Sequence, residues 1–192
     1  CDAASHVAHA FTVHEEAAES EFFSAVDDLV AEDGELGSGH IGNTELTTGV
    51  FYSYIVIDLP LLVKNLAGDT ALAQEVIRRL VLTAATVSPG AKLGSTAPYA
   101  YASLVLAEAG AAQPTSHAAA FARPVAKQGD TQQAAQGALV SHITQLDAMY
   151  GANWQRKISA MHLEGDHATQ LGSGPAVPLA ELADWAATQV EG

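Results

Sequence analysis

Residues 49–59 read GVFYSYIVIDL, and the other elements of the fold are predicted relative to this stretch. Aromatic and β-branched residues fill both of its alternating sets of positions. Because successive residues of a strand point to opposite faces of a sheet, both faces of this strand are predicted to be covered. The sequence therefore predicts a central strand, around which the other elements are placed.

Helices are predicted after this strand. Pro60 suits the first turn of a helix that ends near Gly68, and Asp69 suits the cap of a second helix, whose apolar residues recur at four-residue spacing until Pro89 ends it. Further along the chain we expect a strand at 103–109, helices at 131–150 and 179–190, and loop structure at 164–178.

Before the central strand, residues 5–14 (SHVAHAFTVH) are predicted to form one strand. Residues 15–48 then form an excursion that alternates acidic and apolar pieces. Its middle, EFFSAVDDL, is too apolar for a linker, so we expect a protruding arm. The order of strand, arm, strand, helix pair, strand and helix predicts an α+β fold.

Three histidines fall in the first predicted strand. Because neighbouring residues of a strand face opposite sides, His6 and His14 share one face and His9 lies on the other, which does not suit one coordination sphere. We therefore expect sheet histidines that are satisfied by hydrogen bonds, with a metal site as the alternative. The acidic pair Asp27 and Asp28 is predicted to be a solvated face rather than a divalent site, because adjacent side chains diverge.

The charge of the chain bears on its partners. It has 192 residues, 48% of them hydrophobic, which predicts one domain with a core. There are 8 basic and 22 acidic residues, a formal net charge of −14. Because phosphate binding depends on Lys and Arg, this balance argues against a chain that binds nucleic acid by itself. Any polyanion would have to be held by eight residues: Lys64, Arg78, Arg79, Lys92, Arg123, Lys127, Arg156 and Lys157.

Several function classes lack their signatures. The sequence has no GxxxxGK[ST], GxGxxG, GxSxG or HExxH motif, which argues against phosphate-loop, dinucleotide, α/β-hydrolase and zincin chemistry. No apolar run reaches the about 20 residues that span a bilayer, and no signal-peptide pattern opens the chain. We therefore expect a soluble, cytoplasmic protein with no membrane partner.

The single cysteine, Cys1, stands first without a methionine. We expect it to mark a fragment of a longer protein. The alternatives are an amino-terminal Cys nucleophile hydrolase and a secreted lipoprotein binding module with lipid on Cys1. A nucleophile would need an exposed, base-activated terminus, whereas Cys1 leads directly into the first predicted strand.

Five motifs occur in order along the chain: AHAFTVH, FFSAVDDL, GVFYSY, NLAGD and PGAK. With the sequence around them they resemble, colinearly from Cys1 to the terminal helix, the backbone subunit of the type I-E CRISPR Cascade complex, the CasC family. The resemblance covers the carboxyl-terminal half of that family, whose Arg-rich and Lys-rich segment lies upstream. It implies that residues 1–192 are the carboxyl-terminal part of a single palm and thumb domain.

The resemblance also implies a fold and a function. The fold is an RRM-like (ferredoxin-like) palm sheet with helices, and the excursion at 15–48 is its thumb. Copies of such proteins stack along CRISPR RNA with other Cascade subunits, and each thumb displaces a guide base so that the remaining segments pair with target DNA. The implied protein is structural rather than an enzyme, uses no metal or cofactor, and binds RNA poorly as this half alone.

The same resemblance assigns RNA-binding residues. Phe23, Ser24 and Val26 match the wedge that presses against the displaced nucleotide, where an apolar or aromatic side chain stacks without reading the base. Core packing is the alternative for Phe23. Lys92 matches a lysine near the RNA path, with an ordinary surface lysine as the alternative.

Two residues near the thumb tip, His40 and Ile41, also match, and a structural role or a subunit contact is their alternative. The chain departs from the family pattern at two places. Ser53 stands where the family usually has an arginine, and LGSTAPY replaces a more polar run after PGAK. The family assignment does not depend on these places, but detailed RNA contacts there are not predicted.

Overall fold

The structure is a computed structural model that describes residues 2–15, 19–24, 41–46, 48–88, 99–126, 129–163 and 165–191. Four short strands pair antiparallel, β1 (Ser5–Val7) with β6 (Ile55–Ile57) and β2 (Phe11–Thr12) with β5 (Phe51–Tyr52). Ser5 lies opposite Ile57 and Phe11 opposite Tyr52, so six residue steps on one strand face five on the other. This extra residue marks a β-bulge. The strands predicted at 5–14 and 49–59 are present, but each is interrupted. The prediction of a central strand at 49–59 is wrong for the described residues, because β5 and β6 each pair with one strand only and Phe51 is half exposed.

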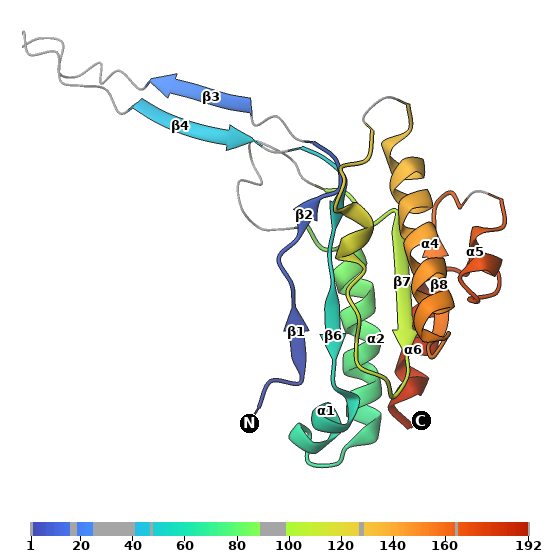
Figure 1. Cartoon of the computed structure of the whole chain (residues 1–192). Helices are drawn as coiled ribbons and strands as arrows, with labels where there is room; N and C mark the ends of the chain where they lie inside the picture. Colours follow the sequence, from blue (N-terminus) through green and yellow to red (C-terminus); the bar gives the residue numbers. More distant parts are fainter. Residues whose placement is uncertain are drawn as a thin grey trace, which may run out of the picture.

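The excursion contains a separate strand pair, β3 (Glu19–Ser24) and β4 (Ile41–Leu46). The two strands run antiparallel, with Glu19 opposite Leu46 and Ser24 opposite Ile41. Figure 1 shows both strands extending away from the rest of the molecule. The arm that the sequence predicts at 15–48 thus has, in its described residues, the form of a projecting β-ribbon, which we call the β3–β4 arm.

Two capped helices follow β6. In α1 (Leu59–Asn65) the carboxylate of Asp58 accepts a hydrogen bond from the Leu61 amide at 2.9 Å. In α2 (Thr70–Thr86) the carboxylate of Asp69 accepts one from the Leu72 amide, also at 2.9 Å. Each bond satisfies an amide that has no partner within its helix. The predicted cap at Asp69 is confirmed.

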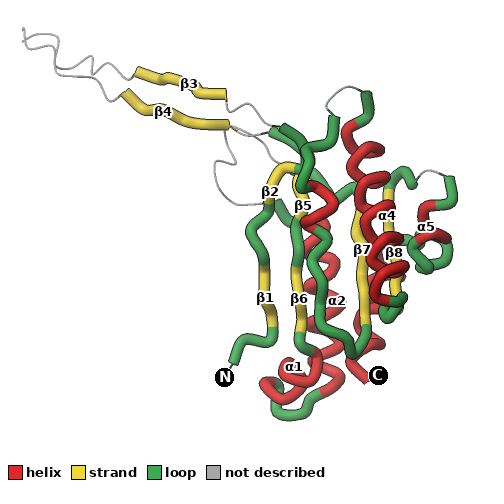
Figure 2. The backbone as a smooth tube through the Cα atoms, viewed as in Figure 1, coloured by secondary structure: helices red, strands yellow, loops and turns green. Residues whose placement is uncertain are grey.

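The carboxyl-terminal part is layered. β7 (Leu104–Ala109) pairs antiparallel with β8 (Gln155–Ala160), and α4 (Thr131–Tyr150) covers one face of this pair. Five buried side chains form the core between them: Leu139, Val140, Ile143, Ile158 and Leu171. α6 (Leu179–Thr188) contacts β7 and β8 and packs along α2. Figure 2 shows β1 with β6 and β7 with β8 as two separate pieces of sheet.

The structure confirms the predicted α+β class and the helix at 131–150, which begins after Asp130, whose carboxylate accepts hydrogen bonds from two amides of the first turn. The strand β8 was not predicted. The region predicted as loop contains a short helix, α5 (His167–Gln170). Two 3-10 helices, η1 (Ala118–Phe121) and η2 (Gln189–Glu191), complete the described elements. Within the described ranges, no helix combines the length and apolarity that crossing a membrane requires.

Candidate nucleic-acid interface

The β3–β4 arm carries three of the six predicted RNA-binding residues. In the strand register Phe23 lies opposite Gly42, and Ser24 lies opposite Ile41. Phe23, Ser24 and Ile41 therefore lie together at the end of the paired segment that is farther from the body (Figure 1). The other three, Val26, His40 and Lys92, lie outside the described residues, so their predicted roles stay predictions.

Three segments that are distant in the sequence meet where the arm leaves the body. The Val13 amide donates to the Val50 carbonyl at 3.0 Å, and the Val125 amide donates to the Val13 carbonyl at 2.9 Å. His14 forms a parallel bridge with Val125. The base of the arm is thus fixed by backbone hydrogen bonds to β5 and to the segment that follows η1.

His14 is the buried polar side chain of this base, with 7% of its surface exposed. Its Nε2 accepts a hydrogen bond from the Val50 amide at 3.1 Å, and its Nδ1 lies 2.9 Å from the Glu15 carbonyl oxygen. An Nε2 that accepts requires the ring proton on Nδ1, which then donates to that carbonyl. His14 is therefore a satisfied sheet histidine, the reading preferred from the sequence. Among the described residues, no three His, Cys, Asp or Glu side chains form a group that could hold a metal ion.

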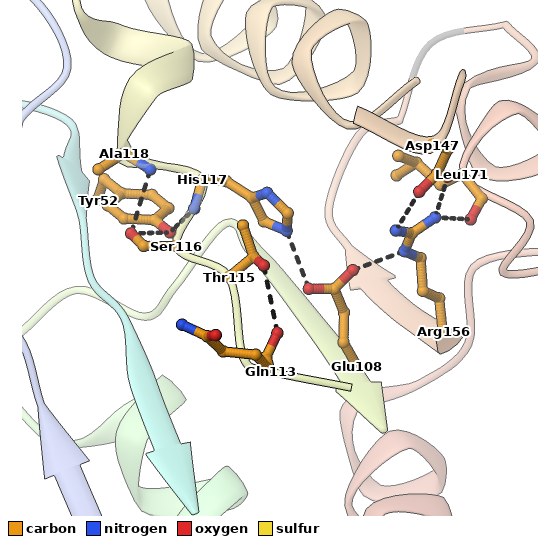
Figure 3. A network of polar contacts seen from close by, with 10 residues as sticks. All are labelled: Tyr52, Glu108, Gln113, Thr115, Ser116, His117, Ala118, Asp147, Arg156 and Leu171. Carbon is orange, nitrogen blue, oxygen red and sulfur yellow. Dashed lines mark hydrogen bonds and ion pairs between the residues drawn. The ribbon is translucent and has the colours of Figure 1, made fainter. Parts of the chain in front are cut away.

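A buried polar network lies deeper in the body (Figure 3). Arg156 of β8 is 8% exposed, and its Nε donates to Glu108 Oε1 at 2.6 Å. Its two terminal nitrogens both contact the carboxylate of Asp147, the second at 2.8 Å, and one also donates to the Leu171 carbonyl at 3.3 Å. The other oxygen of Glu108 lies 2.9 Å from Nε2 of His117.

The network continues to β5. The His117 amide donates to the Tyr52 hydroxyl at 3.0 Å, and that hydroxyl lies 3.5 Å from Ser116 Oγ. The chain Tyr52, His117, Glu108, Arg156, Asp147 therefore joins β5, the segment before η1, β7, β8 and α4. Each charged member has an opposite partner, which is the arrangement that makes a buried charge tolerable.

The pKa values follow from these contacts. Burial would raise the pKa of Glu108, but hydrogen bonds from His117 and Arg156 hold it below its ordinary 4.5. The hydrogen bond with Asp147 raises the pKa of Arg156 further above its usual value. Burial lowers the pKa of His142. Charge repulsion from His117, whose ring centroid lies 5.8 Å from that of His142, lowers this pKa further. Glu108 and Arg156 are therefore both charged, and the network is suited to hold the fold together.

Sequence reasoning missed this network. Glu108 stands in the apolar run SLVLAEA and Arg156 in a stretch to which no element was assigned. A lone charge in an apolar strand is a signal for a buried partner. The partner could not be named, because the Glu108–Arg156 pair depends on the register of β7 against the unpredicted β8.

Half of the eight cations that the sequence offers to a polyanion are in ion pairs. Four have carboxylate partners: Arg78 with Asp184 (2.8 Å), Arg79 with Glu75 (2.6 Å), Lys157 with Glu181 (3.0 Å), and Arg156 with Asp147 and Glu108. Lys92 and Lys127 lie outside the described residues. In the part of the chain that the structure describes, Lys64 and Arg123 are the cations without such a partner. The body therefore offers little unpaired positive charge.

The fold is that of chains from RNA-guided assemblies. A chain of a "CRISPR RNA-guided surveillance complex" superposes with a TM-score of 0.80 and 30% sequence identity, over 96% of this chain and 70% of that chain. A chain of a "CRISPR RNA-guided surveillance complex, pre-nicking" superposes with a TM-score of 0.82 and 28% identity, over 98% of this chain and 55% of that chain. The chain thus spans between about half and about two thirds of the length of these matches.

The sequence profile of one family, the CT1975-like protein, matches residues 1–185. The chain belongs to this CRISPR-associated family, and the structural matches agree with a Cascade-type subunit. No curated protein matches the chain significantly.

Proposed function

We propose that the chain is a structural part of a subunit that binds guide RNA in a CRISPR RNA-guided surveillance complex. The observation that carries this proposal is the match, over nearly the whole chain, to chains of two such complexes at 30% and 28% identity. In these assemblies the protein recognises the backbone and shape of the guide, while base pairing reads the sequence. The role requires no catalytic step by this chain, and its partners are the guide RNA, further copies of itself and the other subunits.

The finer part of the proposal concerns the β3–β4 arm as the thumb of a type I-E backbone subunit. The arm supports it because it projects from the body as a β-ribbon and carries the predicted wedge residues Phe23 and Ser24, with Ile41 opposite. A ring at position 23 would stack on a guide base without reading its identity. The remaining guide bases would then stay free to pair with target DNA.

The charge of the chain fits a shared binding surface. Four of its cations are paired with carboxylates, and the formal net charge is −14. We propose that most guide phosphates are neutralised by protein outside this chain. The chain would then contribute mainly the projecting arm and a few individual phosphate contacts.

The test assembles the complete protein with the other subunits on a guide RNA and probes the guide with nuclease at single-nucleotide resolution. We expect protection that is interrupted at regular intervals where bases are displaced. Phe23→Ala should weaken guide binding about 10-fold, because stacking on one base contributes roughly 1–3 kcal/mol.

Phe22→Ala is the matched control, since neighbouring residues of a strand point to opposite faces. An equal loss in both variants would contradict the assignment of Phe23. A complete protein that recovers no guide RNA would contradict the proposed function itself.

A further inference from the structure

We propose that the pocket between η1 and α4 binds a phosphodiester group of the guide RNA, with Arg123 supplying the positive charge. This inference rests on the proposed function and adds to it a site away from the thumb. The evidence is the composition of the pocket, the unpaired state of Arg123 and the place of η1 beside the base of the arm.

The pocket has a volume of about 580 Å³ and is open to solvent. η1 and the residues after it form one wall, and α4 forms the other. Four of its eight lining residues are alanines, whose small side chains leave room for a ligand. The remaining four are all polar: Arg123, Ser141, His142 and Gln145.

These polar residues suit a phosphate. Among the described residues that line the pocket none is a carboxylate, although the chain has 22 acidic residues. The Gln145 amide donates to Ser141 Oγ at 3.0 Å, so the Ser141 hydroxyl proton stays available to donate to a ligand. A guanidinium with a neighbouring hydroxyl is a common way to hold a phosphodiester.

Arg123 is free to take this role. It is exposed and, unlike Arg78, Arg79, Arg156 and Lys157, it has no carboxylate partner among the described residues. A cation that is already paired attracts a phosphate less strongly, because the carboxylate cancels much of its field. The second unpaired cation in the described part, Lys64, belongs to α1 and does not line the pocket.

The pocket lies beside the base of the β3–β4 arm. The ring of Phe121 in η1 packs against Tyr52 at 5.5 Å and against Phe11 at 6.4 Å between centroids. Two residues after Arg123, the Val125 amide donates a hydrogen bond to the Val13 carbonyl, at the point where the arm leaves the body. A guide strand that reaches the base of the arm would therefore lie close to the pocket.

The test measures guide-RNA affinity of the assembled complex as a function of salt for paired variants. Arg123→Gln should weaken guide binding about 10-fold, the equivalent of 1.4 kcal/mol, at moderate salt. It should also reduce the slope of log affinity against log salt by about 0.7, the value for one single-strand phosphate contact. Lys64→Gln removes the same charge far from the pocket and should leave both quantities unchanged.

A second pair of variants tests the pocket without changing charge. Ala138→Leu fills the cavity from α4 and should weaken guide binding, whereas Ala134→Leu, at an exposed position of the same helix outside the pocket, should not. If the wild-type complex holds its guide but Arg123→Gln and Ala138→Leu behave like their controls, the pocket assignment is overturned and the proposed function stands. If Arg123→Gln and Ala138→Leu weaken binding of target DNA but leave the affinity for guide RNA unchanged, the pocket assignment is also overturned. A wild-type complex that holds no guide overturns both.

Discussion

At the scale of single residues, the His14 ring lies close to Gly49 at the base of the arm. A Cβ placed on Gly49 would lie 2.7 Å from Nε2 of His14, closer than real side chains approach. Nε2 is the atom that accepts from the Val50 amide. Position 49 therefore needs glycine because of this close approach, and the sequence offers no sign of it beyond the G of GVFYSY.

Gly49→Ala should force His14 to move and leave the Val50 amide without its partner. We expect the free energy of unfolding to fall by about 1–3 kcal/mol, the range for an unsatisfied buried donor. Gly137→Ala is the matched control, because a Cβ there meets nothing within 4 Å and alanine favours a helix. Urea unfolding of the two variants checks this. Equal midpoints would show that His14 moves aside without loss.

At the scale of elements, local signals predicted some parts of the fold and not others. The start of α2 was predicted from Asp69, the aspartate that caps its first turn, and α4 proves to begin after a capping aspartate as well. β8 was missed because its sequence, QRKISA, has no local signal beyond a short alternation, and the strand is stabilised by pairing with β7. The arm was predicted because the apolar stretch EFFSAVDDL lies among acidic residues. Its β-ribbon form depends on the pairing of β3 with β4, which composition does not show.

The capping argument gives a matched pair of variants. Asp69→Ala removes the acceptor of the Leu72 amide and should destabilise the protein by about 1 kcal/mol. Asp166 also precedes a helix, α5, but its side chain makes no capping hydrogen bond. Asp166→Ala should therefore leave the thermal midpoint nearly unchanged. Equal shifts in the two midpoints would show that the loss at position 69 is a general effect of removing an acid.

At the scale of the whole molecule, the buried network is one connection between the arm-bearing strands and the layered carboxyl-terminal part. It runs from Tyr52 through His117 and Glu108 to Arg156, and so from β5 to β8. The Phe121 ring, which packs on Tyr52, adds an apolar contact at the same junction. The resemblance predicted the thumb and its wedge, but no local pattern could predict this junction, since its members are distant in the sequence.

Glu108 is the member that joins both sides of the network, so Glu108→Gln should destabilise the protein by roughly 2–4 kcal/mol at pH 7. Because the folded protein holds the pKa of Glu108 below the ordinary 4.5, the charge stabilises the fold above that pH, and its contribution is lost as the pH falls through the folded pKa. The difference in unfolding free energy between wild type and Glu108→Gln should therefore narrow as the pH falls below about 4.5. Urea unfolding across this range measures it. Glu75→Gln is the control, because the Glu75 side chain is 45% exposed and loss of its surface ion pairs with Arg78 and Arg79 should change the free energy of unfolding little. A difference that stays constant down to pH 3 would mean that the shape of the Glu108 side chain, rather than its charge, joins the two parts.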